Sequence, residues 1–307
     1  KTIFGLNEFN VQKARSRMFP YDAVFQEMSR SIGLLATKHK YAKVKFNGNH
    51  WGIMNIESHI SKEFLETEKR KDSIVVRFSN EDGWLYHKVT TNPDYSYRIS
   101  NPLIYTKLYD PSKKMKDEIN RARFSYIVNQ KFLSSEGNLY DTESYLKLLL
   151  LSHIWGSDHT LYINNVKHYF NPYTLKLEPI SSDQVEPREN DFAPCAIHFR
   201  FTLTDIYNNL DKRSLSLFNV KEELNNIRNI VASNIDNSIK SNQKIFPLDH
   251  IAPTDLIKKN MELMSDVNIA PYMDSVVCNK EKSDDKVFDP LNYLNHVYAH
   301  HYSNGKV

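Results

Sequence analysis

The stretch that decides the fold class runs from Asp141 to Asp183 and reads DTESYLKLLLLSHIWGSDHTLYINNVKHYFNPYTLKLEPISSD. The segment from Thr142 to Trp155 is apolar almost all round, which predicts a buried helix. Asp141 is a favoured N-cap residue for it. Gly156 to His159 then has the composition of a loop. The chain is therefore expected to pass directly from the core into a polar loop.

A β-hairpin is predicted after that loop. Asn165 to Phe170 and Leu175 to Ile180 have the composition of strands, and Asn171-Pro172-Tyr173-Thr174 between them is a turn signal. Asp183 stands just beyond the second strand. A short hairpin thus links polar residues on either side of it.

This order of polar residues is the one that phosphoryl transfer uses. Protein kinases place a catalytic Asp, a metal-binding Asn, a hairpin and a metal-binding Asp in succession. The carboxylate meets the acceptor hydroxyl, and oxygen ligands hold a hard divalent cation. Asp158 is the first candidate for the base, and His159, which precedes Asn164 at the kinase interval, is its rival. Spacing alone favours the plainer explanation, that these Asp and Asn residues cap turns.

Further elements are predicted on both sides of this stretch. Upstream, helices are expected at Tyr21–Ser31, Ser61–Glu68 and Lys113–Phe132. Strands are expected at Ala42–Phe46, Trp51–Glu57 and Ser73–Phe78, with a hairpin turn at Asn47-Gly48. Irregular structure is expected over 80–112. Downstream, helices are expected at Asn225–Ser241, from Thr254 to about Met264, and after Asp289-Pro290.

Several motifs, in order, resemble the CotH kinase family of spore-coat-associated proteins. The resemblance covers roughly residues 3 to 185. It is carried by Val44–Gly48, Gly52, Glu57, Lys62–Leu65, Lys71–Phe78, His159–Pro172, Leu177–Ile180 and Asp183.

The resemblance implies a fold and an activity. The fold is α+β, a two-lobed protein-kinase-like domain spanning 1–307. A β-rich N-lobe would occupy 1–135, and the catalytic segment and a mostly helical C-lobe would occupy 136–307. The activity is an ATP-dependent, Mg- or Mn-dependent protein kinase acting on Ser or Thr of a protein substrate. Family members imply a spore-coat, cell-surface or exported location.

The family's roles carry over to individual residues. Asp158 would be the catalytic base, with His159 as the alternative. Asn165 and Asp183 would bind the metal, although Asn165 is also a candidate for ordering the loop.

The nucleotide-binding residues depart from the family pattern. Arg77 takes the place of a phosphate-binding lysine, and a guanidinium does not copy an ammonium; Lys88 is the alternative cation. Glu57 is the expected acidic partner. Glu118 would restore the usual kinase order, in which the lysine precedes the glutamate.

Two other functions stay open. A kinase-like site transfers AMP or ligates an amino acid if ATP binds in another orientation, and the Arg77 departure motivates this alternative. A non-catalytic surface or spore-coat interaction protein is the other, with tyrosine-rich segments such as Tyr95-Ser-Tyr97 as contact faces.

Composition narrows the function classes. Hydrophobic residues make up 40% of the 307, which is enough for a core, and the net charge of +3 does not predict nucleic-acid binding. The eight glycines form neither G-x-x-x-x-G-K-[ST] nor G-x-G-x-x-G. The two cysteines, Cys195 and Cys278, make no disulfide scaffold. No apolar run approaches the roughly 20 residues of a membrane span.

Three remaining features have ordinary explanations. The basic cluster of Lys13, Arg15 and Arg17 either meets phosphate or an acidic partner or lies on a solvated face, which is the commoner outcome. The pair His296 and His300 is expected on a polar helix face. The turn from Gly48 to Gly52 either covers phosphates through backbone N–H groups or is a plain hairpin turn.

Overall fold

The structure is a computed structural model. It describes residues 2–78, 106–109, 140–157, 159–161, 165–189, 213, 217, 219–245 and 254–265. Within these ranges the fold is α+β, as expected, with two small sheets and several helices.

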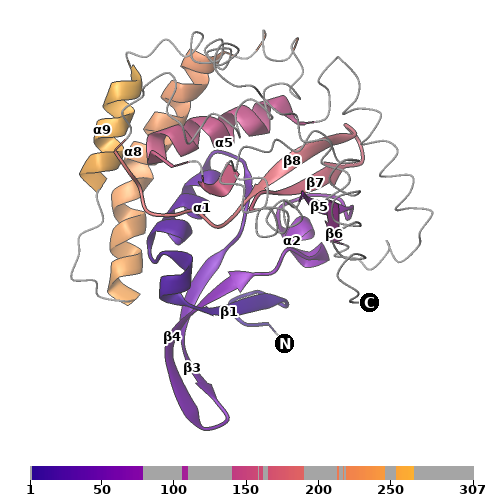
Figure 1. Ribbon diagram of the computed structural model, residues 1–307, viewed down its shortest axis with the longest axis vertical. Helices are drawn as coiled ribbons and strands as arrows, with labels where there is room; N and C mark the ends of the chain where they lie inside the picture. Colours follow the sequence, from indigo (N-terminus) through magenta and orange to yellow (C-terminus); the bar gives the residue numbers. More distant parts are fainter. Residues whose placement is uncertain are drawn as a thin grey trace, which may run out of the picture.

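One sheet has three antiparallel strands. Its order is β1-β4-β3, from Phe9–Lys13, Asn49–Ser58 and His39–Phe46. The Asn47-Gly48 turn joins β3 to β4 with positive φ angles of 48° and 82°, as a tight hairpin turn requires. Figure 1 shows this hairpin projecting from the body of the molecule.

The other sheet has five strands. Its order is β2-β8-β7-β5-β6, from Leu35–Ala36, Lys176–Ser181, Lys167–Asn171, Val75–Phe78 and Thr106–Tyr109. β2 runs parallel to β8 and the other neighbours are antiparallel. This sheet contains strands from both sides of residue 135, where the boundary between the two lobes was predicted. That boundary stays a prediction.

The helices surround α5, which spans Thr142–Trp155. The others are α1 (Tyr21–Ser31), α2 (Lys62–Thr67), α8 (Val220–Ile245), α9 (Thr254–Ser265), and the short 3-10 helices η1 (Ala14–Arg17) and η4 (His159–Leu161). α5 contacts α1, α8, α9 and β8, and Figure 1 shows it crossing the molecule between the paired α8 and α9 and the larger sheet. Its apolar side chains belong to the main core on every face.

Local chemistry sets both ends of α5. The Asp141 carboxylate accepts a hydrogen bond from the Ser144 backbone N at 3.0 Å, as an N-cap does. Gly156 ends the helix with φ 70°, a left-handed conformation that favours glycine. A Cβ there would lie 2.0 Å from the Arg188 carbonyl oxygen. The chain therefore has to leave the core at this glycine.

Most of the expected elements are confirmed, with shifts at their ends. β1 and β2 were not predicted, and β6 contradicts the expectation of irregular structure throughout 80–112. The outcomes of four expectations lie outside the described residues: the helices at 113–132 and after Asp289, and the His296–His300 and Cys195–Cys278 pairs. Among the described helices, none is long and apolar enough to cross a membrane.

Candidate functional site

Three distant segments meet at the guanidinium of Arg17. Its Nε lies 2.9 Å from Glu57 Oε2, and its Nη1 lies 2.6 Å from Asp183 Oδ1. Arg17 ends η1, Glu57 lies near the end of β4, and Asp183 follows β8. The contacts span 40 and 166 residues. We call Arg17, Glu57, Asp183 and the neighbouring His159 the acid–arginine cluster.

The turn after β1 brings Arg17 to Glu57. β1 runs antiparallel to β4, with Asn10 opposite Glu57 and Lys13 opposite Met54. η1 then reverses the chain, and Met18 closes it in a left-handed conformation with φ 43°. Gln12 Nε2 donates a second hydrogen bond to Glu57 Oε2 at 2.8 Å. The Glu57 carboxylate, only 5% exposed, is thus paired and hydrogen-bonded, as a buried charge has to be.

Arg17 is a permanent cation in this setting. Its side chain is 20% exposed. Burial lowers the pKa of Arg17, but the carboxylates of Glu57 and Asp183 raise it by more, so the net shift is upward. The sequence left two alternatives for Arg17, an acidic partner or the commoner solvated face. The structure shows acidic partners, Glu57 and Asp183, which lie far away in the sequence.

Asp183 is held in a left-handed backbone conformation with φ 61°, which aspartate tolerates better than most residues. Its Oδ1 contacts Arg17 and its Oδ2 lies 3.9 Å from His159 Nε2. The side chain is 40% exposed, so an incoming ligand has access to it. The next residue, Gln184, donates its backbone N–H to Asp22 on α1 at 2.9 Å, which anchors the turn.

Hydrogen bonds tie the loop after α5 to the residue before Asp183. Thr160 Oγ1 donates to the Ser182 carbonyl oxygen at 2.9 Å. Asn165 Nδ2 donates to the His159 carbonyl oxygen at 2.9 Å. The first bond fixes the loop against β8, and the second closes the loop on itself. Asn165 thus orders the loop in this structure, and its metal-binding role stays a prediction.

Asp22 and His39 form a buried pair next to the cluster. Asp22 accepts the hydrogen bond from Gln184, the residue after Asp183. Burial raises the pKa of Asp22 to about 6, although hydrogen bonds from Gln184 and Gln26 lower it. Burial lowers the pKa of His39 to about 4. His39 Nε2 lies 3.8 Å from Asp22 Oδ2. At neutral pH the aspartate is therefore mostly ionised and the imidazole is neutral, so the two form no full ion pair.

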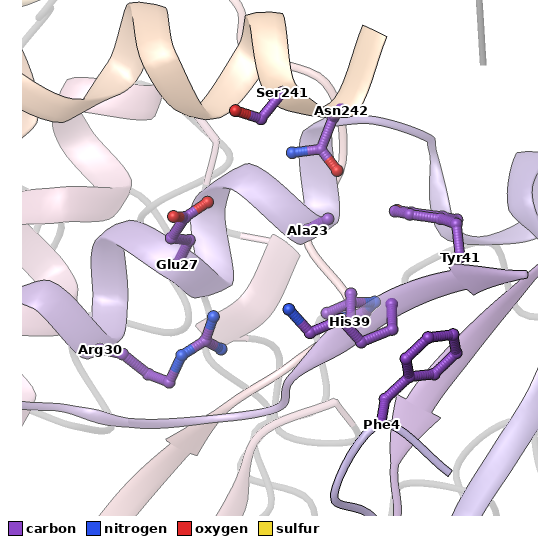
Figure 2. Close-up of a pocket in the computed structure, with 9 residues that line it drawn as sticks. Phe4, Ala23, Glu27, Arg30, His39, Tyr41, Ser241 and Asn242 are labelled. Carbon is purple, nitrogen blue, oxygen red and sulfur yellow. The ribbon is translucent and has the colours of Figure 1, made fainter. Parts of the chain in front are cut away.

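A pocket of about 560 Å³ is lined by His39 but not by Asp22. Figure 2 shows Glu27 and Arg30 of α1 and Asn242 of α8 around it, with His39 and Tyr41 of β3. His39 is a lining residue, but no member of the acid–arginine cluster is. The chemistry of the candidate site is therefore assigned to the partly exposed cluster and not to this pocket.

The oxygen ligands that the cluster offers suit a metal ion that is bound together with a nucleotide. Mg²⁺ usually keeps several waters and takes one or two carboxylates plus substrate phosphates. Asp183 supplies one accessible carboxylate, with only Oδ1 held by Arg17. Within the ranges that the structure describes, no three His, Cys, Asp or Glu side chains group to hold an ion by themselves. Among the described residues, a site built from three such side chains is therefore not found.

The predicted site residues have separate outcomes. Glu57 and Asp183 both contact Arg17, and His159 lies 3.9 Å from Asp183. Asn165 reaches only the backbone carbonyl oxygen of His159. Arg77 lies on β5, opposite Lys107 of β6, and its nucleotide-binding role stays a prediction. Asp158, Lys88 and Glu118 lie outside the described residues.

The comparisons with known proteins add no relative. Neither the protein-family models nor the curated proteins contain a match for this chain. The resemblance to the CotH kinase family therefore rests on the quoted motifs, and the family assignment is a proposal.

Proposed function

We propose that this chain is a phosphotransferase of the CotH kinase type, with a two-lobed kinase-like arrangement. It would use ATP and Mg²⁺ or Mn²⁺ to phosphorylate Ser or Thr of a protein partner. One observation carries the proposal: Glu57 and Asp183, predicted as acidic partner and metal ligand, both contact the guanidinium of Arg17. Kinases use such a cation, held by a glutamate, beside the metal-binding aspartate.

Arg17 is our candidate for the phosphate-binding cation. Glu57 holds the Nε edge of the guanidinium, 2.9 Å away. Because Nη1 lies 2.6 Å from Asp183, phosphates held at Asp183 through a metal ion would lie within its reach. A guanidinium binds phosphate oxygens bidentately and stays charged. Arg17 thus supplies the contact that the resemblance assigned to Arg77.

The remaining residues position the acceptor and the proton. A bound Mg²⁺ or Mn²⁺ ion, held by Asp183, would neutralise charge on the phosphates. The hydroxyl oxygen of the acceptor forms a bond to the γ-phosphorus as the bond to the β-phosphate oxygen breaks, and ADP leaves. Asp158 or His159 accepts the hydroxyl proton. Asn165 and Thr160 hold that loop in place.

The test follows the nucleotide products. Purified protein is mixed with ATP, Mg²⁺ or Mn²⁺ and a serine-rich acceptor, and products are separated by chromatography. We expect ADP from wild type and at least about a hundredfold less from Asp183→Ala. Asp236→Ala is the matched control, because Asp236 is also a half-exposed aspartate in one ion pair, with Lys258 at 3.1 Å and 44% exposure.

Other outcomes would reject the proposal. AMP with pyrophosphate would establish the AMP-transfer alternative. Equal ADP from wild type and Asp183→Ala would remove Asp183 from the site. Absence of both turnover and calorimetric ATP binding would leave the non-catalytic interaction protein.

A further inference from the structure

The outer end of the β3–β4 hairpin is built in an unusual way. β3 and β4 pair in register from His39↔Glu57 to Val44↔Gly52, and the register then shifts, with Lys45 opposite His50. The shift leaves Trp51 as an extra residue in β4. Gly52 beside it has φ 82°, a conformation that favours glycine. This is a β-bulge, a device that re-aims a side chain.

The bulge places two large aromatic side chains together in solvent. The rings of Phe46 and Trp51 lie 5.1 Å apart at 43°. Phe46 is 55% exposed and Trp51 is 51% exposed. They contact each other at the end of a hairpin that projects from the molecule (Figure 1), and neither belongs to the core clusters. The pair therefore does not extend the core, and it presents an exposed apolar surface that is available for a contact.

The same tip carries positive charge. From His39 to Ile56 the sequence has no acidic residue, and Lys43 and Lys45 stand near the turn. Both lysines are exposed. Because side chains alternate along a strand, Lys43 and Lys45 lie on the face opposite Phe46, with His50 paired across from Lys45. The tip is thus aromatic on one face and cationic on the other.

We propose that this hairpin tip docks on an anionic lipid surface. Aromatic side chains favour the membrane–water interface, and lysines near it are attracted to anionic headgroups. With the aromatic pair inserted, the long lysine side chains reach back to the headgroup phosphates.

The shape of the tip favours lipid over other anionic partners. The aromatic pair projects outward, so a protein partner needs a matching cavity, whereas a lipid interface deforms around it. Binding of single-stranded nucleic acid uses aromatic rings and cations along one groove, but here they lie on opposite faces of one hairpin. About 25 Å of extended strand separates the tip from Glu57. Docking of the tip therefore leaves the acid–arginine cluster open to solvent. The same distance speaks against a phosphate-covering role for the turn.

Vesicle binding tests this proposal independently of any enzymatic activity. The full chain is mixed with vesicles of phosphatidylcholine alone or with phosphatidylserine, and bound protein is measured by sedimentation. We expect binding to the anionic vesicles, a blue shift of tryptophan emission that is lost when Trp51 is replaced, and weakening by salt. Phe46→Ser with Trp51→Ser, and Lys43→Gln with Lys45→Gln, should each reduce the partition coefficient about tenfold or more.

Two matched controls make the test specific. Tyr173→Ser removes an aromatic side chain that is 76% exposed at the turn of the β7–β8 hairpin, and Lys221→Gln with Lys240→Gln removes two exposed charges on α8. Both should bind as wild type does. No vesicle binding, equal binding by the tip variants, or binding to polyglutamate but not to vesicles would overturn the proposal, the last in favour of an acidic protein partner.

Discussion

At the scale of single residues, Arg17 is the centre of the candidate site. Its two carboxylate partners differ in environment: Glu57 is 5% exposed, and Asp183 is 40% exposed. Removal of the cation leaves a buried carboxylate that still accepts a hydrogen bond from the Gln12 side chain, whereas solvent compensates the exposed Asp183 carboxylate. We therefore expect Arg17 to contribute to stability through Glu57 and to ligand binding through Asp183.

Arg17→Ala should lower the free energy of unfolding by about 2 kcal/mol. The reason is the partly uncompensated Glu57 carboxylate, and urea denaturation measures the change. Arg17→Ala combined with Glu57→Gln should be less destabilising than the sum of the two single changes. Lys258→Ala, which breaks an ion pair whose members are 42% and 44% exposed, should cost less than about 1 kcal/mol. An equal cost for both cations would contradict the central position of Arg17.

Asp22 and His39, the buried pair beside the cluster, change the pH dependence of stability in opposite directions. Burial raises the pKa of Asp22 from 3.8 to about 6, so between these values the folded state keeps a proton that the unfolded chain has lost. This contribution to stability falls as the pH rises. Burial lowers the pKa of His39 from 6.5 to about 4, so in that window the unfolded chain binds the extra proton. This contribution rises with pH.

Replacement of one partner should therefore expose the titration of the other. In Asp22→Asn, the free energy of unfolding should rise more steeply between pH 4 and 6.5 than in wild type, because the opposing titration of Asp22 is gone and that of His39 remains. In His39→Gln it should fall over pH 4 to 6, because Asp22 remains. Urea denaturation at a series of pH values measures both slopes. Parallel curves for the three proteins would show that burial does not shift these two groups.

At the scale of elements, the sequence predicted those helices and turns whose formation depends on neighbouring residues. Asp141 and the apolar run after it predicted α5, and Asn47-Gly48 predicted the turn of β3–β4. β2 is only Leu35–Ala36 and exists through its parallel pairing with β8, which no local pattern reveals. The role of Arg17 in the candidate site was not predicted for the same reason, since its partners lie 40 and 166 residues away.

Gly156 tests how the end of α5 sets the loop toward His159. Gly156→Ala should cost more than the roughly 1–2 kcal/mol of a left-handed alanine, because the new Cβ would lie 2.0 Å from the Arg188 carbonyl oxygen. Gly33→Ala after α1 is the control: its φ is 85°, but nothing lies within 4 Å of its Cβ position. Thermal denaturation compares them. Equal losses would mean that the backbone of Arg188 moves away freely.

At the scale of the whole molecule, the candidate site joins the two sheets. Glu57 comes from the three-stranded sheet, Asp183 follows the five-stranded one, and Arg17 connects them. The order of residues around the β7–β8 hairpin singled out Asp183, and the family resemblance singled out Glu57 as a candidate acidic partner. The cation could not be predicted, because it depends on how η1 returns the chain to β4.

A ligand that binds across this junction should stabilise the whole fold. Under the proposed function, ATP with Mg²⁺ contacts Arg17 and Asp183 together in the folded state only, which at a hundred times its Kd adds about 2.7 kcal/mol. We expect the Tm to rise for wild type and for Asp236→Ala, and to rise much less for Arg17→Ala and Asp183→Ala. Omission of Mg²⁺ should abolish most of the rise, because the aspartate then faces the phosphates without an intervening cation. A rise of equal size in all four proteins would place the nucleotide elsewhere and would separate nucleotide binding from the acid–arginine cluster.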